Sequence, residues 1–292
     1  MRVLSIIVSY NFEPWLDKCL SSLLNSTYPT DVIVIDNASR DNTAVQIRQK
    51  YPEVLLIENN ENLGFGRANN LGIQYALKNN YDFVFLVNQD AWVHPDCLNN
   101  LLNTSYPEHV GVISPLHYDG TTQALDKGFN HYIQSLDLRL ENTTAPFINA
   151  AFWLIPSTTL TRIGAFSPLF YHYGEDKDFA NRLRYHGLTI AVNQQAIAYH
   201  DRQSRPEKLP ETAIYKSEFV YFLTEYANIN YTFIKAFGYS VIAALKKAVT
   251  KSTALSFTAY IRISVALIGR TRAVVRTRKE NKESGNGHRK YI

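Results

Sequence analysis

Four short apolar runs, separated by segments with helical spacing, open the chain. The runs lie at 3–8, 32–35, 54–57 and 83–87, and the helical patterns lie at about 14–25, 40–50 and 67–78. This alternation predicts a parallel sheet whose strands are joined by right-handed crossovers. The run at 83–87 reads FVFLV, without a polar residue, which is typical of a strand buried on both faces. We therefore expect an α/β domain with helices on both sides of its sheet.

The pattern becomes less regular after residue 100. A candidate strand at 147–155 is followed by a short helix and then by a helix predicted over 176–186, with Gly187 as its C-terminal cap. A strand at 188–192 and an apolar segment at 196–204 come next. The length of 292 residues and the hydrophobic content of 46% allow one large domain and a smaller appendage.

Charge is distributed unequally along the chain. From Lys235 to the C-terminus there are 13 Lys and Arg against two acids, whereas the preceding 234 residues carry 17 basic and 24 acidic residues. The two cysteines, Cys19 and Cys97, lie in apolar patterns without metal-ligand spacing, which fits a reducing compartment. The first apolar run is too short for a signal peptide or a membrane span, so we expect a cytoplasmic protein.

Polar side chains directly follow three of the predicted strands. They are Ser9-Tyr10-Asn11, Asp36-Asn37-Ala38-Ser39 and Asn88-Gln89-Asp90. Parallel strands end on the same side of a sheet, so these loops should lie along one rim, where open α/β sheets bind ligands. Asp90 is well placed there to hold a divalent cation against phosphates, and capping of a turn is the alternative.

Two further features could contact a nucleotide at this rim. Asp36 could accept hydrogen bonds from a nucleobase or ribose, or it could belong to a turn that caps the next helix. In NLGFGRANN at 62–70, the glycines permit close backbone approach and Arg67 could meet a phosphate at a helix start. The alternative for this segment is an ordinary loop, with Asn69 and Asn70 exposed on the helix.

Glu175 and Asp176 stand at the start of the predicted helix over 176–186. Acidic residues in a first turn favour the helix macrodipole, so stabilisation of the helix is one interpretation. A carboxylate kept ionised there could also accept a proton from a hydroxyl, and the preceding FYHYG suits stacking on a sugar. His200 ends the apolar segment AIAYH, where it could be structural or could complete a metal site begun by Asp90.

Taken together, six segments resemble the inverting family 2 glycosyltransferases with a GT-A fold, especially the bacterial rhamnosyltransferase-like branch. The segments are IVSYN at 7–11, VIDNAS at 34–39, NLGFGRANN at 62–70, NQD at 88–90, YGEDKDFANRLRYHG at 173–187 and YH at 199–200. The order and spacing of all six carry the resemblance, which covers roughly residues 1–205. It implies a Rossmann-like mixed sheet flanked by helices.

The resemblance also implies roles for individual residues. The donor sugar nucleotide would be held by Ser9, Tyr10, Asn11, Asp36, Asn37, Gly66, Arg67, Asn70, Asn88 and Gln89. Asp90 corresponds to the last acid of the family's DxD motif, which binds Mg²⁺ or Mn²⁺, and His200 matches a histidine that often helps to hold that ion. Asp176 would be the base that deprotonates the acceptor hydroxyl, and Glu175 is the alternative.

Two positions depart from the family pattern. Residue 88 is Asn where many members have Asp, which removes one charged ligand and favours a lower affinity for the cation. Residues 149–151 read Asn-Ala-Ala where relatives often have Gly-Ala, which is expected to change the geometry on the acceptor side.

The segment 211–275 is aromatic and apolar with interspersed cations. Lys246, Lys247 and Arg262 interrupt its apolar stretches, so no transmembrane helix is expected. Basic amphipathic helices suit an anionic membrane surface, and packing on the catalytic domain or on a second subunit is the alternative. Residues 276–292 are predicted to be a disordered basic tail. No motif supports nucleic-acid binding.

The sequence therefore predicts a GT-A catalytic domain over 1–210, a helical extension over 211–275 and a tail over 276–292. The expected function is transfer of a sugar, by analogy rhamnose, to a bacterial cell-surface glycan or lipid-linked acceptor. The reaction would be metal-assisted and inverting, at the inner face of the cell membrane. Two alternatives are a sugar nucleotidyltransferase, which would be expected to carry a triphosphate loop that YNFEP lacks, and a non-catalytic glycan-binding scaffold.

Overall fold

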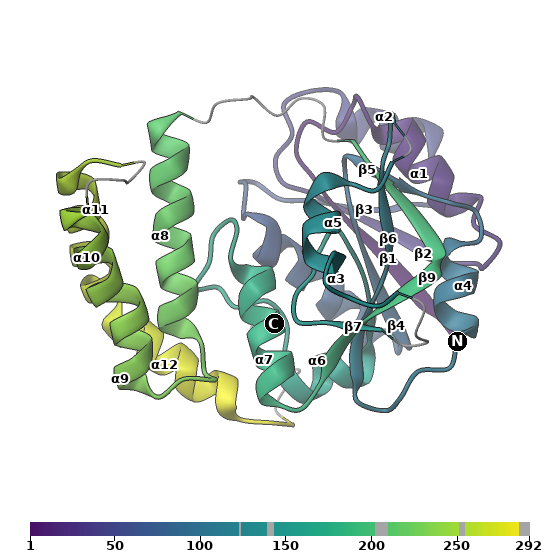
Figure 1. Ribbon diagram of the computed structural model, residues 1–292. Helices are drawn as coiled ribbons and strands as arrows, with labels where there is room; N and C mark the ends of the chain where they lie inside the picture. The colour runs from purple at the N-terminus through teal and green to yellow at the C-terminus, as the bar shows by residue number, and fades with distance from the viewer. Residues whose placement is uncertain (123, 139–142, 202–209, 251–254, 286–292) are drawn as a thin grey trace.

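The computed structural model describes residues 1–122, 124–138, 143–201, 210–250 and 255–285. A mixed sheet with helices on both faces forms one part of the molecule, and a layer of helices from the C-terminal third stands beside it (Figure 1). The order of the hydrogen-bonded strands is β3-β2-β1-β4-β8-β6-β9-β5, and β7 pairs with β9. The expected mixed α/β sheet flanked by helices is thereby confirmed.

The first half of the chain builds the parallel part of the sheet. Its strands are β1 (Val3–Ser9), β2 (Asp31–Asp36), β3 (Leu55–Glu58) and β4 (Phe83–Asn88), and its helices are α1 (Leu16–Leu24), α2 (Thr43–Lys50) and α3 (Phe65–Lys78). Successive side chains of a strand point to opposite faces, so Leu4 and Ile6 enter one core and Val3 and Ile7 enter the other. Both faces are consequently apolar, as the unbroken run FVFLV predicts.

The second half adds strands of mixed direction. The strands are β5 (Ala91–Val93), β6 (Val110–Asp119), β7 (Thr144–Ala145), β8 (Phe152–Pro156) and β9 (Thr189–His200). The helices are α4 (Cys97–Asn103), α5 (Lys127–Ile133), α6 (Ser157–Ile163) and α7 (Glu175–Tyr185). Strand β8 is antiparallel to β4, so the residues before β8 lie at the rim where β4 ends.

The sequence prediction differs from the structure in the second half of the sheet, where β5, β6 and β7 were not predicted. The segments 188–192 and 196–204 were expected to be separate, but Thr189–His200 forms the single strand β9, which pairs with β6 across a register shift at Pro115/Leu116. Strand β6 was not expected, because Pro115 interrupts its apolar pattern. The irregularity accommodates that proline, which cannot donate a ladder hydrogen bond.

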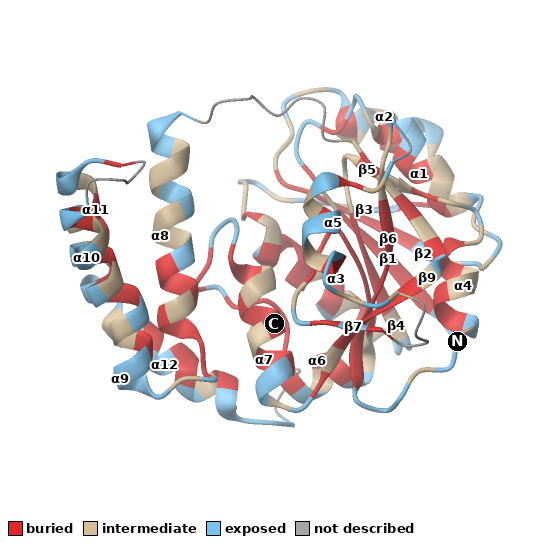
Figure 2. Ribbon diagram, in the orientation of Figure 1, coloured by how far each residue is buried: buried red, intermediate tan, exposed pale blue. Residues whose placement is uncertain are grey.

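The C-terminal third is a helical extension. It consists of α8 (Glu211–Ala227), α9 (Phe233–Phe237), the π-helical turn η1 (Gly238–Ile242), α10 (Ala243–Val249), α11 (Phe257–Gly269) and α12 (Thr271–Lys282). These helices share an apolar core with Leu169 and Phe170, from the segment before α7 (Figure 2). Of the helices described, none is long and apolar enough to cross a membrane.

Residues 276–282 were predicted to be disordered, and this prediction is wrong. Helix α12 includes this stretch, and Arg278 is 5% exposed and Asn281 is fully buried. Arg278 donates to the backbone oxygens of Tyr226, Asn228 and Tyr231, which explains how a basic sequence can be ordered here. Residues 286–292 lie outside the described part of the chain.

Candidate active site at the carboxyl ends of the parallel strands

The predicted rim exists, and three parallel strands deliver their last residues to it. Ser9 of β1 pairs with Asp36 of β2, and Val8 pairs with Asn88 of β4. The loops after these strands therefore begin at the same level of the sheet, as expected for a ligand site in an open α/β fold.

Asp36 is a fully organised hydrogen-bond acceptor. Its Oδ1 accepts from the hydroxyl of Ser9 at 2.7 Å, and its Oδ2 accepts from the backbone N–H of Ser39 at 3.0 Å. The hydroxyl of Ser39 also donates to Asp36, whose exposure is 3%. Donors of this kind stabilise a carboxylate, so Asp36 is fixed in place at the rim where β2 ends.

The loops around Asp36 contain strained backbone. Asn11 has φ 53° and Ala38 has φ 62°, in the left-handed region that residues with a Cβ adopt rarely. Asn11 is held there by its neighbours, because its N–H donates to Ser39 Oγ at 2.8 Å and its Oδ1 accepts from Arg40 N at 2.9 Å. Such strain persists where surrounding contacts maintain it, and it clusters at functional sites.

Asn37 connects this rim to the glycine segment at 62–70. Its amide donates to the carbonyl oxygen of Gly64 at 3.3 Å and its Oδ1 accepts from Asn59 Nδ2 at 2.9 Å. Gly64 has φ 79°, and a Cβ there would lie 1.9 Å from the carbonyl oxygen of Tyr171. The glycine is therefore required by close contact with the segment that precedes α7.

The start of α3 lies directly against the start of α7. A Cβ on Gly66 would lie 3.4 Å from the Cβ and Cγ of Glu175. Asn70 Nδ2 donates to the carbonyl oxygen of Phe166 at 2.8 Å, and Asn70 Oδ1 accepts from Phe166 N at 2.9 Å. Arg67 Nη2 donates to the carbonyl oxygen of Pro168 at 3.3 Å. In the structure, Asn70 and Arg67 thus hold the segment 166–168.

The Asn88-Gln89-Asp90 turn is joined to two neighbouring loops. Gln89 exchanges hydrogen bonds with the backbone of Tyr10, accepting at 2.7 Å and donating at 3.2 Å. Asp90 Oδ1 lies 3.0 Å from His200 Nε2. Antiparallel pairing of Ala91 with His200 produces this contact between residues that are far apart in the sequence.

The pair formed by Asp90 and His200 has the chemistry of a partial cation site. The imidazole is 1% exposed, and the carboxylate, 28% exposed, faces the rim. Oxygen and imidazole donors suit Mn²⁺ well and Mg²⁺ less well. Among the described residues, no group of three or more His, Cys, Asp or Glu could hold a metal ion. The protein would therefore supply two ligands, leaving the other positions to a diphosphate and water.

Helix α7 begins with two carboxyl groups in different surroundings. Glu175 is 3% exposed, and among the described residues its Oε2 has no hydrogen-bond partner. Burial, together with the nearby Asp176 charge, raises the pKa of Glu175 to about 7. Asp176 is half-buried and accepts from the backbone N–H of Lys177 at 2.7 Å. Burial also raises the pKa of Asp176.

Asp176 lies next to the strand-end rim. The backbone N–H of Ala150 is a further donor to its carboxylate. The adjacent Ala151 accepts a hydrogen bond at 3.0 Å from the backbone N–H of Asn88. Asn149, beside them, has a buried Oδ1 without a partner among the described residues. The structure thus brings Asp176 to the turn that carries Asp90.

A buried ion pair within α7 connects this helix to the segment that precedes it. Arg182 Nε donates to Asp178 Oδ2 at 3.0 Å, and both side chains are almost fully buried. The other guanidinium nitrogens donate to the carbonyl oxygens of Ile163 and Ala165, each at 2.7 Å. Helical spacing places Asp178 and Arg182 on one face, but the sequence does not show that this face is buried.

The helical extension also reaches the site. Lys177 follows Asp176 and places its Nζ 4.4 Å from the centre of the Phe147 ring. Burial lowers the pKa of Lys177, while the nearby charges of Glu225, on α8, and Asp176 raise it. A Cβ on Gly174 would lie 2.7 Å from Val220 Cγ1 of α8. Packing on the catalytic domain was the alternative to membrane binding for these helices, and the contact of α8 with the start of α7 is of that kind.

Comparison with known proteins identifies the family. Residues 5–163 match the glycosyl transferase family 2 domain. A relative named N-acetylglucosaminyl-diphospho-decaprenol L-rhamnosyltransferase, from Mycobacterium tuberculosis, is 26% identical over 234 residues, which are 68% of this chain and 76% of the relative.

Solved structures share the fold at low sequence identity. A mannosyltransferase from Pyrobaculum calidifontis, in complex with GDP-Man and Mn²⁺, superposes with a TM-score of 0.58 at 17% identity, covering 96% of this chain and 86% of that one. TarS 1–349 from S. aureus, in complex with UDP-GlcNAc, gives 0.60 at 14% identity, covering 99% and 90%. The chain belongs to glycosyl transferase family 2 and is a nucleotide-sugar-dependent glycosyltransferase.

Proposed function

We propose that this enzyme moves a sugar from a nucleoside diphosphate to an acceptor hydroxyl, with inversion at the anomeric carbon. One observation carries the proposal: Asp176 is tied through Ala150 and Ala151 to the strand end that bears Asn88 and Asp90. A candidate base and the candidate diphosphate site therefore lie side by side, which is the arrangement that in-line displacement requires.

The donor would be held by the loops after β1 and β2. The fixed carboxylate of Asp36 is suited to accept hydrogen bonds from the nucleobase or ribose, with Ser9, Tyr10, Asn11 and Asn37 around it. The diphosphate would lie toward Asn88 and Gln89. Gly66 and Arg67 at the start of α3 complete the donor side, and Asn70 would act by positioning the neighbouring loop.

Asp176 is the better candidate for the base. It is half-buried, whereas Glu175 is 3% exposed beneath Gly66. In the reaction, Asp176 accepts the proton of the acceptor hydroxyl as the oxygen attacks the anomeric carbon opposite the leaving diphosphate. Glu175 is then a buried neighbour whose charge state affects Asp176. A base with a raised pKa needs a correspondingly higher pH to be ionised, so activity should fall on the acid side.

Asp90 and His200 would hold a divalent ion, Mg²⁺ or Mn²⁺. Such an ion, when bound, neutralises the charge that develops on the departing diphosphate. With Asn at position 88, the protein supplies little negative charge of its own. We therefore propose that ion binding depends strongly on the bound nucleotide.

The acceptor is proposed to be a bacterial cell-surface glycan or a lipid-linked sugar. The name of the M. tuberculosis relative describes rhamnosyl transfer to a lipid-linked diphospho-sugar. Rhamnose is accordingly the first sugar to test, and glucose, galactose, N-acetylglucosamine and mannose are the next.

A donor assay tests the proposal. Purified protein is incubated with dTDP-rhamnose, UDP-glucose, UDP-galactose, UDP-GlcNAc or GDP-mannose, with and without Mn²⁺, and both binding and donor hydrolysis are measured. We expect at least one donor to bind and to be turned over, more rapidly with Mn²⁺. Failure to bind or turn over any donor would contradict the proposal.

Asp176→Asn tests the base. Loss of a general base should lower transfer by about 10²- to 10⁴-fold while donor affinity stays within threefold. Glu108→Asn, at an exposed position, is the control. Near-normal transfer by Asp176→Asn would move the role to Glu175.

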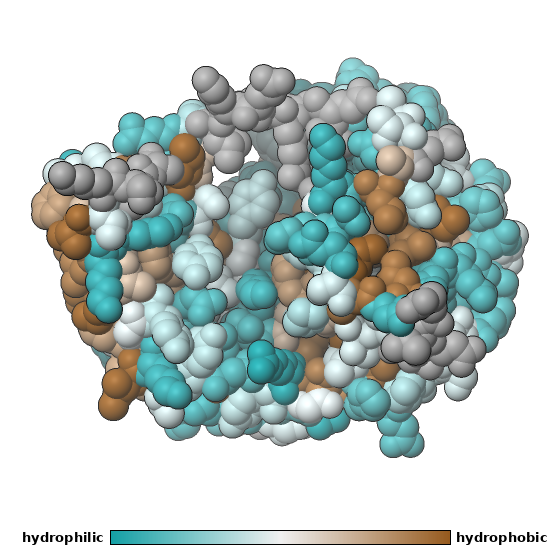
Figure 3. All heavy atoms as spheres, viewed as in Figure 1, coloured by the Kyte–Doolittle hydropathy of each residue, from teal (hydrophilic) through white to brown (hydrophobic). Residues whose placement is uncertain are grey.

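The extension is proposed to bring the enzyme to the inner face of an anionic membrane. Its outer helices expose Ile234, Val249 and Val265, at 83%, 74% and 63%, next to the cations of Lys246 and Arg262. Apolar side chains gather on the edge of the molecule formed by α9, α10 and α11 (Figure 3). Exposed apolar groups flanked by cations favour an anionic lipid surface.

Vesicle sedimentation tests this surface with point variants that leave the extension folded. The full chain should bind vesicles of phosphatidylglycerol and phosphatidylcholine more strongly than phosphatidylcholine alone. Ile234→Ser combined with Val249→Ser should reduce binding by at least fivefold, whereas Val45→Ser, on α2, should not. Equal binding by all three proteins would contradict the membrane role.

A further inference from the structure

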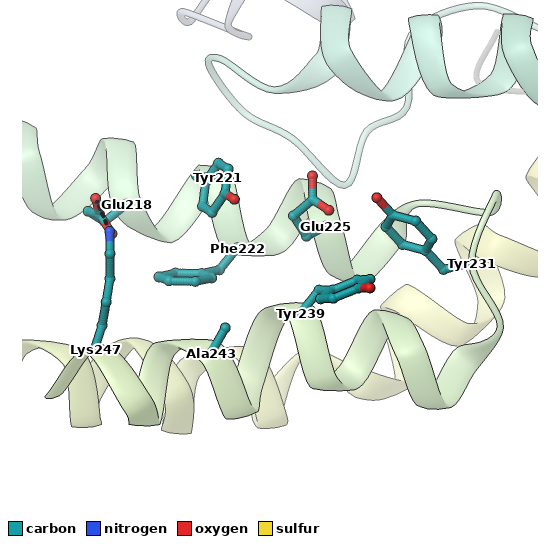
Figure 4. A pocket seen from close by; sticks show the side chains of 8 residues that line it. All are labelled: Glu218, Tyr221, Phe222, Glu225, Tyr231, Tyr239, Ala243 and Lys247. Carbon is teal, nitrogen blue, oxygen red and sulfur yellow. Dashed lines mark hydrogen bonds and ion pairs between the residues drawn. The ribbon is translucent and has the colours of Figure 1, made fainter. Parts of the chain in front are cut away.

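A groove outside the candidate active site runs between α8 and the segment formed by η1 and α10. Its volume is about 530 Å³, within the range of about 300–1,000 Å³ in which proteins bind small ligands. The polar groups that line it are Glu218, Tyr221, Glu225, Tyr231, Tyr239 and Lys247 (Figure 4). The groove therefore offers aromatic rings, carboxylates and an ammonium group, above a floor that includes Phe222.

The two ends of the groove are held by polar contacts. At one end Lys247 Nζ donates to the two carboxylate oxygens of Glu218 at 2.7 and 2.9 Å, as drawn in Figure 4. Toward the other end a hydrogen bond joins Tyr231 to Glu225. The rings of Tyr231 and Tyr239 lie 5.0 Å apart in an edge-on arrangement. These contacts fix the geometry of the groove before a ligand arrives.

A π-helical turn supplies one of the aromatic rings. Tyr239 belongs to η1, Gly238–Ile242, and its exposed fraction is 52%. Across the groove, Tyr221 is 57% exposed. Turns of this kind are rare and frequently occur at functional sites. Tyr221 and Tyr239 are thus accessible on the two sides of the groove, whereas Tyr226 and Tyr260 of the same helical layer are buried.

The groove lies near the start of α7. Glu225 interacts with the charge of Lys177, and Lys177 in turn interacts with Asp176. Val220 and Thr224, on the face of α8 turned away from the groove, both lie within 3.0 Å of a Cβ placed on Gly174. Helix α8 thus separates most of the groove from Gly174, and the end of the groove at Glu225 is the part that approaches Lys177 and the candidate base.

The chemistry of the groove fits a neutral saccharide. Carboxylate oxygens accept hydrogen bonds from sugar hydroxyls, and tyrosyl hydroxyls both donate and accept them. A tyrosine ring can also cover the apolar C–H face of a sugar. Two carboxylates against one paired ammonium disfavour a phosphate group. We propose that the groove is an acceptor subsite, which binds a sugar unit next to the one that carries the attacked hydroxyl. This inference rests on the proposed glycosyl transfer.

Sugar binding to the full chain tests the subsite. The probes are L-rhamnose, N-acetylglucosamine and galactose, and the methyl glycoside of each, titrated at millimolar concentration with binding followed by saturation-transfer NMR. The sugars that bind should lose about 3- to 10-fold in affinity in Tyr239→Ala and in Tyr221→Ala, the range expected for one aromatic contact. Tyr239→Phe keeps the ring and should stay within twofold.

Binding of nucleotide sugars separates this inference from the proposed function. Donor affinity should be unchanged in the groove variants, because neither tyrosine belongs to the donor side. Unaltered sugar binding in both alanine variants, or no binding of any probe, overturns the subsite and leaves the donor reaction untouched. Sugar binding that depends on Tyr239, in a protein that binds no nucleotide sugar, would overturn the glycosyl transfer and retain the groove as a glycan site.

Discussion

The candidate active site has a proposed donor side, around Asp36, and a proposed base side, around Glu175 and Asp176. The two sides hold their carboxyl groups in different ways. On the donor side, Asp36 accepts from the hydroxyl of Ser9 and from both the N–H and the hydroxyl of Ser39. On the base side, the Oε2 atom of Glu175 is buried without a partner among the described residues, and the pKa of Glu175 rises to about 7. Both carboxyl groups are 3% exposed, so burial alone does not decide their behaviour.

The difference lies in the hydrogen-bond donors that surround each group. Side-chain hydroxyls and a backbone N–H donate to both oxygens of Asp36. Glu175 accepts only from backbone N–H groups, and burial together with the Asp176 charge outweighs them and raises its pKa. The donor side is thereby suited to fixed recognition, whereas the base side is suited to exchange of protons near neutral pH. The three predictions below test this contrast, starting with the largest expected effect.

Arg182→Met should destabilise the base side most strongly. The substitution leaves the carboxylate of Asp178 buried without its ion-pair partner, which costs about 3–5 kcal/mol in buried pairs. It also removes the donors to Ile163 and Ala165, which lead into the segment held by Asn70. The measurement is the free energy of unfolding from urea denaturation at pH 7.

Arg184→Met is the matched control, because Arg184 is exposed on the same helix. It should change the free energy of unfolding by less than about 0.5 kcal/mol. Equal effects of the two substitutions would show that the buried ion pair does not stabilise α7. A large loss of stability with unchanged donor affinity would show that the two sides of the site are structurally independent.

Glu175→Gln should change how stability depends on pH. Because the pKa of Glu175 is raised by folding, the native state holds this proton more tightly, and stability falls as pH rises from about 4.5 to about 7. Removing the titrating group should flatten that fall by up to about 3 kcal/mol. The measurement compares unfolding free energies of the variant and the wild type at pH 5 and pH 8.

Glu108→Gln, at an exposed position, is the control and should leave the pH dependence unchanged. Asp176 and Asp178 also have raised pKa values, so part of the fall should remain in Glu175→Gln. If the unfolding free energy of Glu175→Gln depended on pH as in the wild type, the Oε2 atom of Glu175 would have a hydrogen-bond donor in solution. The contrast between the two sides would then be smaller than the structure indicates.

The donor side was largely predictable from the sequence, because its signals are local. Parallel strands that end in polar residues must place those residues on one rim, so Ser9, Asp36 and Asn88 could be grouped without a structure. The pairing of Asp90 with His200 was one of two interpretations of the strand-end position of His200, and the resemblance also implied it. The contact depends on the pairing of β5 with β9. Strand β5 is three residues long, so no local sequence pattern reveals this pairing.

The base side depends on contacts between distant segments, and these were not predictable. An arginine in a helix is usually exposed, yet Arg182 is fully buried and pairs with Asp178. The prediction of disorder from residue 276 was wrong for the same reason. Arg278 and Asn281 donate to buried groups on α8 and α7, which lie far away in the sequence. Arg278 was interpreted as solvated because its partners Tyr226, Asn228 and Tyr231 are 52, 50 and 47 residues away in the sequence.

Asp36→Asn should give the smallest of the three effects and should act on the donor alone. The variant keeps the shape of the side chain, but it replaces one charged acceptor oxygen with an amide donor that faces the hydroxyl of Ser9 or the N–H of Ser39. Losing hydrogen bonds to a charged group should weaken binding of the preferred nucleotide by about 10- to 100-fold, measured by calorimetry. Asp17→Asn is the control, since Asp17 is exposed and pairs with Lys50. Asp36→Asn could instead lower transfer at saturating donor while nucleotide affinity is unchanged. Asp36 would then take part in the transfer step, and the proposed division into a donor side and a base side would be wrong.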